Sequence, residues 1–126
     1  MLNGVRVLVV EDERLVAEHI ADVLEEAEAV VVGPISTGTE ARQLVRSGVK
    51  IDVAVLDLNL ADGSAMPLLE ALAARRVPAL IYSGAALPDP IRRRHPELVA
   101  LTKPAAPARL IAELRRATGQ LVLARA

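Results

Sequence analysis

The segment VLVVEDE, residues 7–13, raises the question on which the fold assignment depends. Its first four residues are aliphatic and continue a run that begins at Val5, as expected for a buried strand. The run then passes, without a polar transition, into Glu11, Asp12 and Glu13. What three carboxylates do at the end of a buried strand depends on how the other strands of the chain end.

Aliphatic runs of strand length alternate with segments of helical periodicity along the chain. The predicted strands are Val5–Val10, Ala29–Val32, Val53–Leu56, Ala79–Tyr82 and Leu98–Leu101. The predicted helices are Leu15–Glu28, Gly38–Ser47, a segment from near Ser64 to Arg76, about two turns between residues 88 and 96, and Pro107–Thr118. Continuous aliphatic strands are buried on both faces, so this alternation predicts an α/β fold with a doubly wound, five-stranded parallel sheet.

Boundary signals support several of these elements. Thr37, with Glu40 three positions later, forms a capping box that starts the second helix. Gly33-Pro34 is expected to end the second strand. The last residues, QLVLARA at 120–126, could extend the final helix, pack on a partner or fray.

The composition limits the class of protein. At 126 residues the chain has room for one core, so we expect a single domain over residues 1–126. Hydrophobic residues make up 52% of the chain but aromatic ones only 1%, so Val, Leu, Ile and Ala must form the core. The chain has no cysteine, which excludes disulfides and cysteine-ligated metals. Its net charge of -1 and lack of a bilayer-length apolar run predict a cytoplasmic protein without nucleic-acid or membrane partners.

Polar side chains follow four of the predicted strands. Glu11 and Asp12 follow the first strand, Asp57 the third, Ser83 the fourth, and Lys103 lies just beyond the fifth. Ligands of such sheets bind at the carboxyl ends of the strands, so we expect these side chains to lie together. Neighbouring carboxylates repel one another unless a counter-charge is present, and Mg²⁺ prefers oxygen ligands of this kind. The carboxylates after the first strand therefore predict a magnesium site.

The same residues suggest chemistry on phosphorus. A carboxylate such as Asp57 can attack a phosphoryl donor and form an aspartyl-phosphate. Lys103 would neutralise phosphoryl oxygens and the Ser83 hydroxyl would donate to another. Positioning and charge stabilisation are most of what phosphoryl transfer requires from a protein.

Four segments, VLVVEDE, DVAVLDLNLADG, ALIYSG and LTKP, together resemble the receiver domains of two-component response regulators. They occur in the family's order and spacing, and the resemblance covers essentially the whole chain. It is greatest for stand-alone, chemotaxis-receiver-like members. The resemblance implies a flavodoxin-like (βα)5 fold with strand order 2-1-3-4-5.

The resemblance also implies roles for the residues at the strand ends. Asp57 corresponds to the phospho-acceptor, and Glu11 and Asp12 to the acidic pair that binds Mg²⁺ together with Asp57 and the backbone carbonyl of Asn59. The phosphoryl group would come from a phosphohistidine on a sensor histidine kinase or a histidine phosphotransfer protein. Such a domain catalyses only its own phosphorylation and dephosphorylation, and acts on a downstream protein that the sequence does not identify.

The remaining correspondences include two departures. Ser83 matches the family's switch hydroxyl, and Lys103 its lysine, whose bond to the following proline is usually cis in the family. Many receivers have an aromatic residue three positions before this lysine, where this chain has Ala100, and a Phe after Lys-Pro, where it has Ala105. The aromatic rotamer switch is therefore expected to be missing, and the surface around the last strand to be unusual.

Two other functions stay open at this point. A degenerate receiver would act as a binding module without phosphorylation. A phosphohydrolase that forms an aspartyl-phosphate would usually have a second, acid/base Asp two residues after the nucleophile, and here that residue is Asn59.

Several polar residues also have structural interpretations. Residues 11–13 alone could be acids in the first turn of a helix, where the macrodipole stabilises each by roughly 0.3–1 kcal/mol. The other strand-end motifs favour the metal site over this alternative. His19 and His95 are expected on the surface, the RRRH run at Arg92–His95 in a solvated or partner-facing patch, and Asp62 in a turn.

Overall fold

The computed structural model describes residues 1–63 and 65–119. Strands and helices alternate in the order β1 (Arg6–Val10), α1 (Arg14–Glu26), β2 (Val30–Ile35), α2 (Gly38–Arg46), β3 (Val53–Leu56), α3 (Ala65–Ala74), β4 (Ala79–Ser83), α4 (Asp89–Arg94), β5 (Val99–Thr102) and α5 (Pro107–Ala117). The expected helix start at Ser64 and the expectations for residues 120–126 lie outside the described residues.

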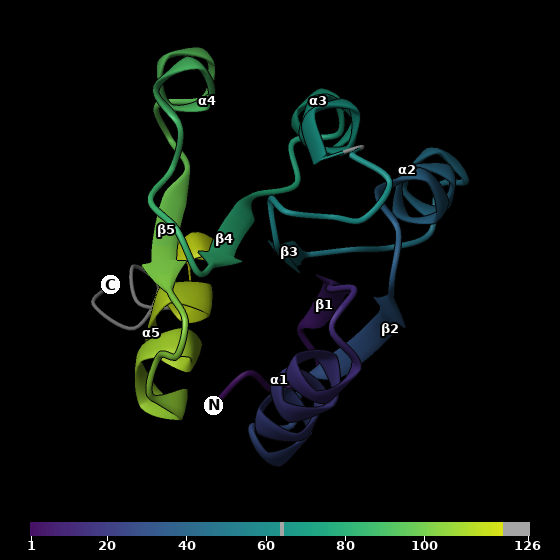
Figure 1. Ribbon diagram of the computed structural model, residues 1–126. Coiled ribbons are helices and arrows are strands. Elements are labelled where there is room, and N and C mark those ends of the chain that lie inside the picture. The colour runs from purple at the N-terminus through teal and green to yellow at the C-terminus, as the bar shows by residue number, and fades with distance from the viewer. Residues whose placement is uncertain (64, 120–126) are drawn as a thin grey trace.

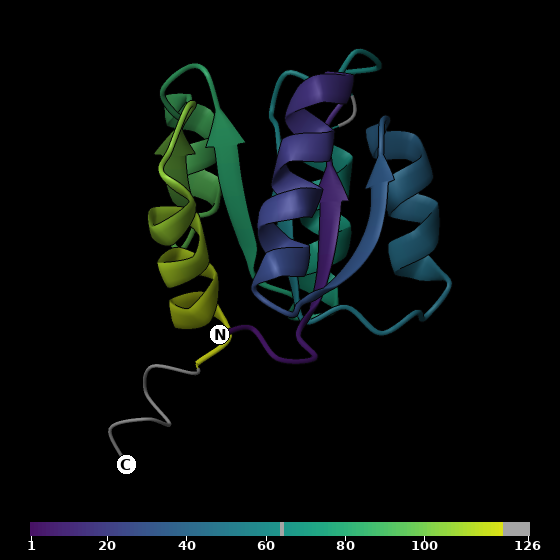
Figure 2. The same cartoon turned by 90° about the horizontal axis from the view of Figure 1, so that it is seen from below.

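The strands form one parallel sheet in the order β2-β1-β3-β4-β5. Helices α1 and α5 cover one face, and α2, α3 and α4 lie on the other side (Figure 1). All strands point the same way, so their carboxyl ends share one edge, at the top of Figure 2. The doubly wound fold and its strand order are confirmed.

The core has two layers, and alternate residues of each strand supply one or the other. Val7 and Val9 of β1 belong to the cluster formed with α1 and α5, while Leu8 and Val10 belong to the cluster formed with α2 and α3. Residues of β3 divide in the same way, with Val53 and Val55 in the first cluster and Ala54 and Leu56 in the second. Both faces of these strands are therefore dry, which explains why their sequences are continuously aliphatic.

The second strand is longer than predicted. β2 continues through Gly33-Pro34 to Ile35, and its pairing with β1 shifts between Leu8 and Val10. Gly33 permits this irregularity because its φ is +102°, a region that side chains rarely allow. The prediction that Gly33-Pro34 ends the strand was therefore wrong, and the added residues let the Ile35 carbonyl accept a hydrogen bond from the Glu11 N–H at 2.9 Å.

The capping signal at the start of α2 is confirmed. Thr37 is the N-cap, and its hydroxyl accepts a hydrogen bond from the Glu40 N–H at 3.2 Å. Asp62, in the turn after β3, reinforces the same helix end, since its carboxylate accepts hydrogen bonds from the Thr39 hydroxyl at 2.8 Å and the Thr39 N–H at 3.2 Å. The β3–α3 loop is thus tied to the start of α2.

His95 is buried, which contradicts its expected surface position. Its exposed fraction is 6%, and it follows the short helix α4. The helix ends here because the following Pro96 disfavours helical backbone at His95, whose φ is −130° and ψ is 69°. This backbone conformation places the imidazole between Glu70 of α3, with Nε2 at 3.9 Å from its Oε1, and Glu97, with Nδ1 at 3.5 Å from its Oε1. Arg92–Arg94 are exposed, as predicted.

Within residues 1–63 and 65–119, no helix has the length and apolar character needed to cross a bilayer.

The irregularity in β2 generates a test of Gly33. A Cβ at this position would lie 2.8 Å from the Ile35 nitrogen and 3.1 Å from the Val9 oxygen, and both are backbone atoms that cannot move cheaply. We expect Gly33→Ala to lower the free energy of unfolding by about 1–3 kcal/mol in urea denaturation, because strain adds to a disfavoured φ. Gly84→Ala is the matched control, since Gly84 has open space and no positive φ. Equal urea midpoints for the two variants would show that the irregularity in β2 does not require glycine at position 33.

Candidate functional site

The strand ends meet because of the register of the sheet. Val10 pairs with Leu56, so the next residues, Glu11 and Asp57, leave the ends of β1 and β3 side by side. On the neighbouring strands Ser83 pairs with Thr102. The Lys103 N–H then bonds the Ser83 carbonyl at 2.8 Å, which keeps Lys103 at the same edge.

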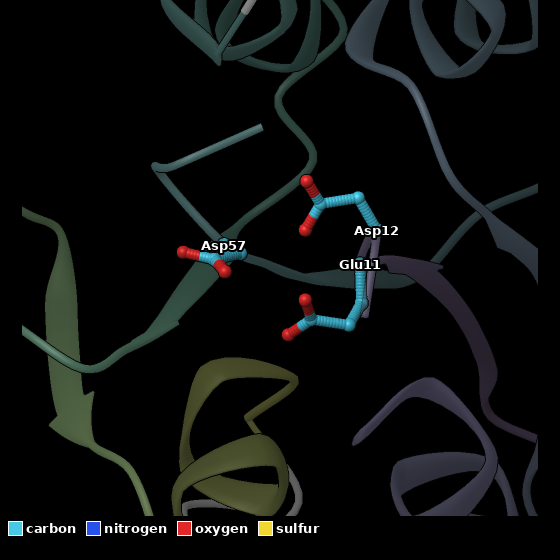
Figure 3. A group of neighbouring side chains, drawn as sticks. All are labelled: Glu11, Asp12 and Asp57. Atoms are coloured by element: carbon cyan, nitrogen blue, oxygen red, sulfur yellow. The ribbon is translucent and has the colours of Figure 1, made fainter. Parts of the chain in front are cut away.

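Three carboxylates converge at this edge. Glu11, Asp12 and Asp57 each offer an oxygen, and these oxygens lie within 4.8 Å of one another. Figure 3 shows the three side chains turned toward a common space. Glu11 is 3% and Asp57 4% exposed, whereas Asp12 is half-buried. Carboxylate oxygens grouped in this way are the donors that a hard divalent cation prefers.

Lys103 links two of these carboxylates. Its Nζ lies 2.5 Å from Glu11 Oε1 and 2.9 Å from Asp57 Oδ2. Two nearly buried anions would be costly without such a partner. Glu11, Asp12, Asp57 and Lys103 together still carry a formal charge of −2 when ionised, which matches one divalent cation.

The remaining oxygens of the buried carboxylates are held by the backbone. The Glu13 N–H donates to Glu11 Oε2 at 3.1 Å, and the Asn59 N–H donates to Asp57 Oδ1 at 3.0 Å. The Ser83 side chain also helps to lower the pKa of the Asp57 carboxyl. The carboxylates are therefore oriented by the chain itself.

The alternative role for residues 11–13, as acids in the first turn of a helix, does not match the structure. Helix α1 begins at Arg14 and has no acidic residue in its first turn. Glu13 is the N-cap, but its side chain makes no capping hydrogen bond. Glu11 and Asp12 precede the helix and face the cluster instead.

The environment separates the pKa values of the two buried carboxyls. Burial opposes ionisation of Asp57, but the Asn59 N–H and Lys103 outweigh it and hold the pKa of Asp57 below its usual value. Burial raises the pKa of Glu11 above its usual value, although Lys103 and the Glu13 N–H act in the opposite direction. Burial alone would lower the pKa of Lys103, but its bonds to Glu11 and Asp57 raise it. Glu11 is thus the proton-sensitive member of the network.

The other predicted site residues are also at this edge. Asn59 lies in the loop directly after Asp57, with an exposed side chain, so its backbone carbonyl stays a predicted ligand. The Lys103–Pro104 peptide bond is cis, as the resemblance implied. Ala100, on β5, is exposed and has no aromatic ring to offer.

One residue of the site was missed by the sequence analysis. Tyr82, next to Ser83 on β4, is 4% exposed, and its ring centroid lies 5.9 Å from Lys103 Nζ. Its hydroxyl accepts a hydrogen bond from the Ala105 N–H at 3.0 Å. The available signal was its uniqueness, since the chain has one Tyr and no Phe or Trp.

Solved structures confirm the fold independently. A response regulator receiver protein from Sinorhizobium medicae is 25% identical, with a TM-score of 0.78 and 100% of both chains covered. SdrG from Pseudomonas melonis, solved in its BeF3-activated conformation, is 35% identical, with a TM-score of 0.72, and the match covers 93% of this chain and 98% of that one. The receiver domain of the sensor histidine kinase PA1611 from Pseudomonas aeruginosa, which holds a magnesium ion in its active-site cleft, is 24% identical, with a TM-score of 0.78 and 92% and 98% of the two chains covered.

No curated protein matches the chain. The family model of the response regulator receiver domain matches residues 7–115, which include β1 from Val7 onward, strands β2 to β5 and all the residues of the candidate site. The chain therefore belongs to the response regulator receiver domain family.

Proposed function

We propose that this receiver domain accepts a phosphoryl group on Asp57 from a phosphohistidine of a histidine kinase or a histidine phosphotransfer protein, in a Mg²⁺-dependent reaction. The observation that carries the proposal is the convergence of Glu11, Asp12 and Lys103 on Asp57. If Asp57 had only a structural role, the half-buried Asp12 beside it would add charge repulsion without any gain in stability. An aspartate that receives a phosphoryl group needs positive charge beside it, which Lys103 and a bound Mg²⁺ would supply.

The donor set fits Mg²⁺. We assign the ion to the oxygens of Glu11, Asp12 and Asp57, with the Asn59 carbonyl as a further ligand. Few carboxylates, completed by waters and phosphoryl oxygens, are the usual surroundings of this ion. When bound, Mg²⁺ neutralises charge on the phosphoryl oxygens during transfer. The magnesium ion in the cleft of the PA1611 receiver, a protein of the same fold, supports this assignment.

The residues of the chain then have separate roles in transfer. Asp57 is ionised, because its pKa is lowered, and one of its oxygens forms the new bond to phosphorus while the donor's P–N bond breaks and the imidazole leaves with the electron pair. Lys103 and the Ser83 hydroxyl are placed to bind phosphoryl oxygens after transfer. Asp57 accepts hydrogen bonds at both of its oxygens, so the nucleophile is oriented before the donor arrives.

We further propose that the domain has no separate enzymatic product. Transfer to Asp57 and hydrolysis of the aspartyl-phosphate are the reactions that it would promote. Ala85, two residues after Ser83, has no polar side-chain group to position an attacking water, whereas the exposed amide of Asn59 could do so.

The phospho-acceptor can be identified directly. We expect acetyl phosphate to label the protein in the presence of Mg²⁺, to give no labelling with EDTA, and to give none in Asp57→Ala. Mass spectrometry after reductive trapping locates the modified residue. Asp22→Ala is the control, since Asp22 lies in the C-terminal half of α1, away from the helix end that follows Asp12. Persistent labelling of Asp57→Ala would show that the assignment is wrong. A wild-type protein that is neither labelled nor perturbed by beryllofluoride in amide NMR spectra would be a phosphorylation-independent binding module.

Removal of Lys103 should expose the charge imbalance of the site. Lys103→Met leaves two nearly buried carboxylates without their cation, so we expect a loss of roughly 3 kcal/mol in the free energy of unfolding at neutral pH without metal. Mg²⁺ should restore more stability to this variant than to the wild type. Denaturant titrations with EDTA and with Mg²⁺ measure both effects. Lys50→Met is the matched control, because Lys50 is exposed. Equal effects of the two substitutions would contradict the proposed network.

We expect Glu11 to strengthen Mg²⁺ binding and to lower the stability of the metal-free protein. Its pKa is raised in the folded protein, so ionised Glu11 lowers the free energy of unfolding at pH values above that pKa. We expect Glu11→Gln to raise the melting temperature without metal and to weaken Mg²⁺ binding, measured by calorimetry. In the wild type, acidification should weaken Mg²⁺ binding because Glu11 becomes protonated. As the pH is lowered, this loss should already begin above pH 4.5, the usual pKa of this carboxyl.

Glu25→Gln, an exposed acid of α1, should change neither the melting temperature nor Mg²⁺ binding. If Glu11→Gln retained wild-type Mg²⁺ affinity, Glu11 would not be a ligand.

A further inference from the structure

Tyr82 contacts the segment that carries Lys103 at two points. Its ring lies 5.9 Å from the Lys103 ammonium, measured to the centroid, which is within the range of a cation–π interaction. Its hydroxyl accepts the Ala105 N–H at 3.0 Å. The ring therefore lies close to the charged group, and the hydroxyl fixes the backbone two residues further along.

Tyr82 itself is held rigidly. It belongs to the core cluster between the sheet and helices α1 and α5, and its backbone pairs with Leu101 of β5. A tyrosine has few rotatable bonds, and this one is 4% exposed. It can therefore act as a fixed support for a neighbour that is less constrained.

Lys103 needs such a support. A lysine has a flexible four-carbon side chain with a compact charge, and it loses much rotamer freedom when its ammonium is held in one place. Its two ion-pair partners also change during the proposed function, because Asp57 loses its carboxylate charge when it becomes an acyl phosphate, and Glu11 would ligate the metal. The Tyr82 ring remains the same in both states.

We propose that Tyr82 is a positioning residue, which holds the Lys103 ammonium beside Asp57 through its ring and holds the Lys103–Ala105 segment through its hydroxyl. This inference rests on the proposed phosphorylation of Asp57. It assigns to β4 an aromatic residue that acts on the lysine of the site, in a chain whose β5 has Ala100 instead.

The test is a double-mutant cycle on the full chain, with the initial rate of Mg²⁺-dependent acetyl-phosphate labelling as the readout. We expect Tyr82→Leu to lower the rate by about 3- to 10-fold, in keeping with loss of a partly desolvated cation–π contact. In a Lys103→Met background, Tyr82→Leu should lower the rate no further, because its effect passes through the lysine. A full additional loss in that background would overturn the proposal.

Two further variants separate positioning from stability. Tyr82→Phe keeps the ring and removes the hydroxyl, so it should retain most of the labelling rate while the Ala105 amide exchanges faster with solvent. A Tyr82→Phe rate as low as that of Tyr82→Leu would refute the role of the ring. Leu101→Ala weakens the same core cluster, and any effect that it has on the rate should be the same factor with and without Lys103. If Leu101→Ala also lost its effect on the labelling rate in the Lys103→Met background, to the same extent as Tyr82→Leu, the effect of Tyr82 would be one of general stability. That result would overturn the proposal.

The outcome is separable from that of the proposed function. Wild-type protein that is not labelled on Asp57 would refute the function itself. Normal wild-type labelling with an additive Tyr82–Lys103 cycle would refute only the role of Tyr82.

Discussion

The Lys103 ammonium between Glu11 and Asp57 is the interaction on which the site depends. It joins the end of β5 to the ends of β1 and β3, three strands that are far apart in the sequence. Two nearly buried carboxylates tolerate this position because one cation serves both. The network still carries a formal charge of −2 when ionised, which a divalent cation would balance.

Much of this arrangement follows from local rules. The aliphatic strands had to be buried on both faces, which required a parallel sheet, and a parallel sheet brings residues such as Asp12, Asp57 and Ser83 to one edge. For that reason the fold and the convergence of the site could be predicted from the sequence. The strand order could not be obtained from periodicity, and it came from resemblance to a family.

The features that were not predicted depend on three-dimensional neighbours. Gly33-Pro34 is a stop signal in isolation, but pairing with β1 carries the strand past it. His95 follows three exposed arginines, yet the end of α4 turns its ring toward Glu70 and Glu97. The importance of Tyr82 depends on where Lys103 and Ala105 lie relative to its ring and hydroxyl, and no local pattern records such a contact.

The hydrogen bonds between Asp62 and Thr39 connect the loop that follows Asp57 to helix α2. This loop begins at Asp57, whose N–H donates a hydrogen bond to β1. Near its other end, Asp62 accepts hydrogen bonds from Thr39 in the first turn of α2. A shift of this loop would therefore either move the first turn of α2 or break the hydrogen bonds that Asp62 accepts from it. Helix α2, which packs on the opposite face of the sheet from the core cluster of Tyr82, is thus coupled to the loop that follows Asp57.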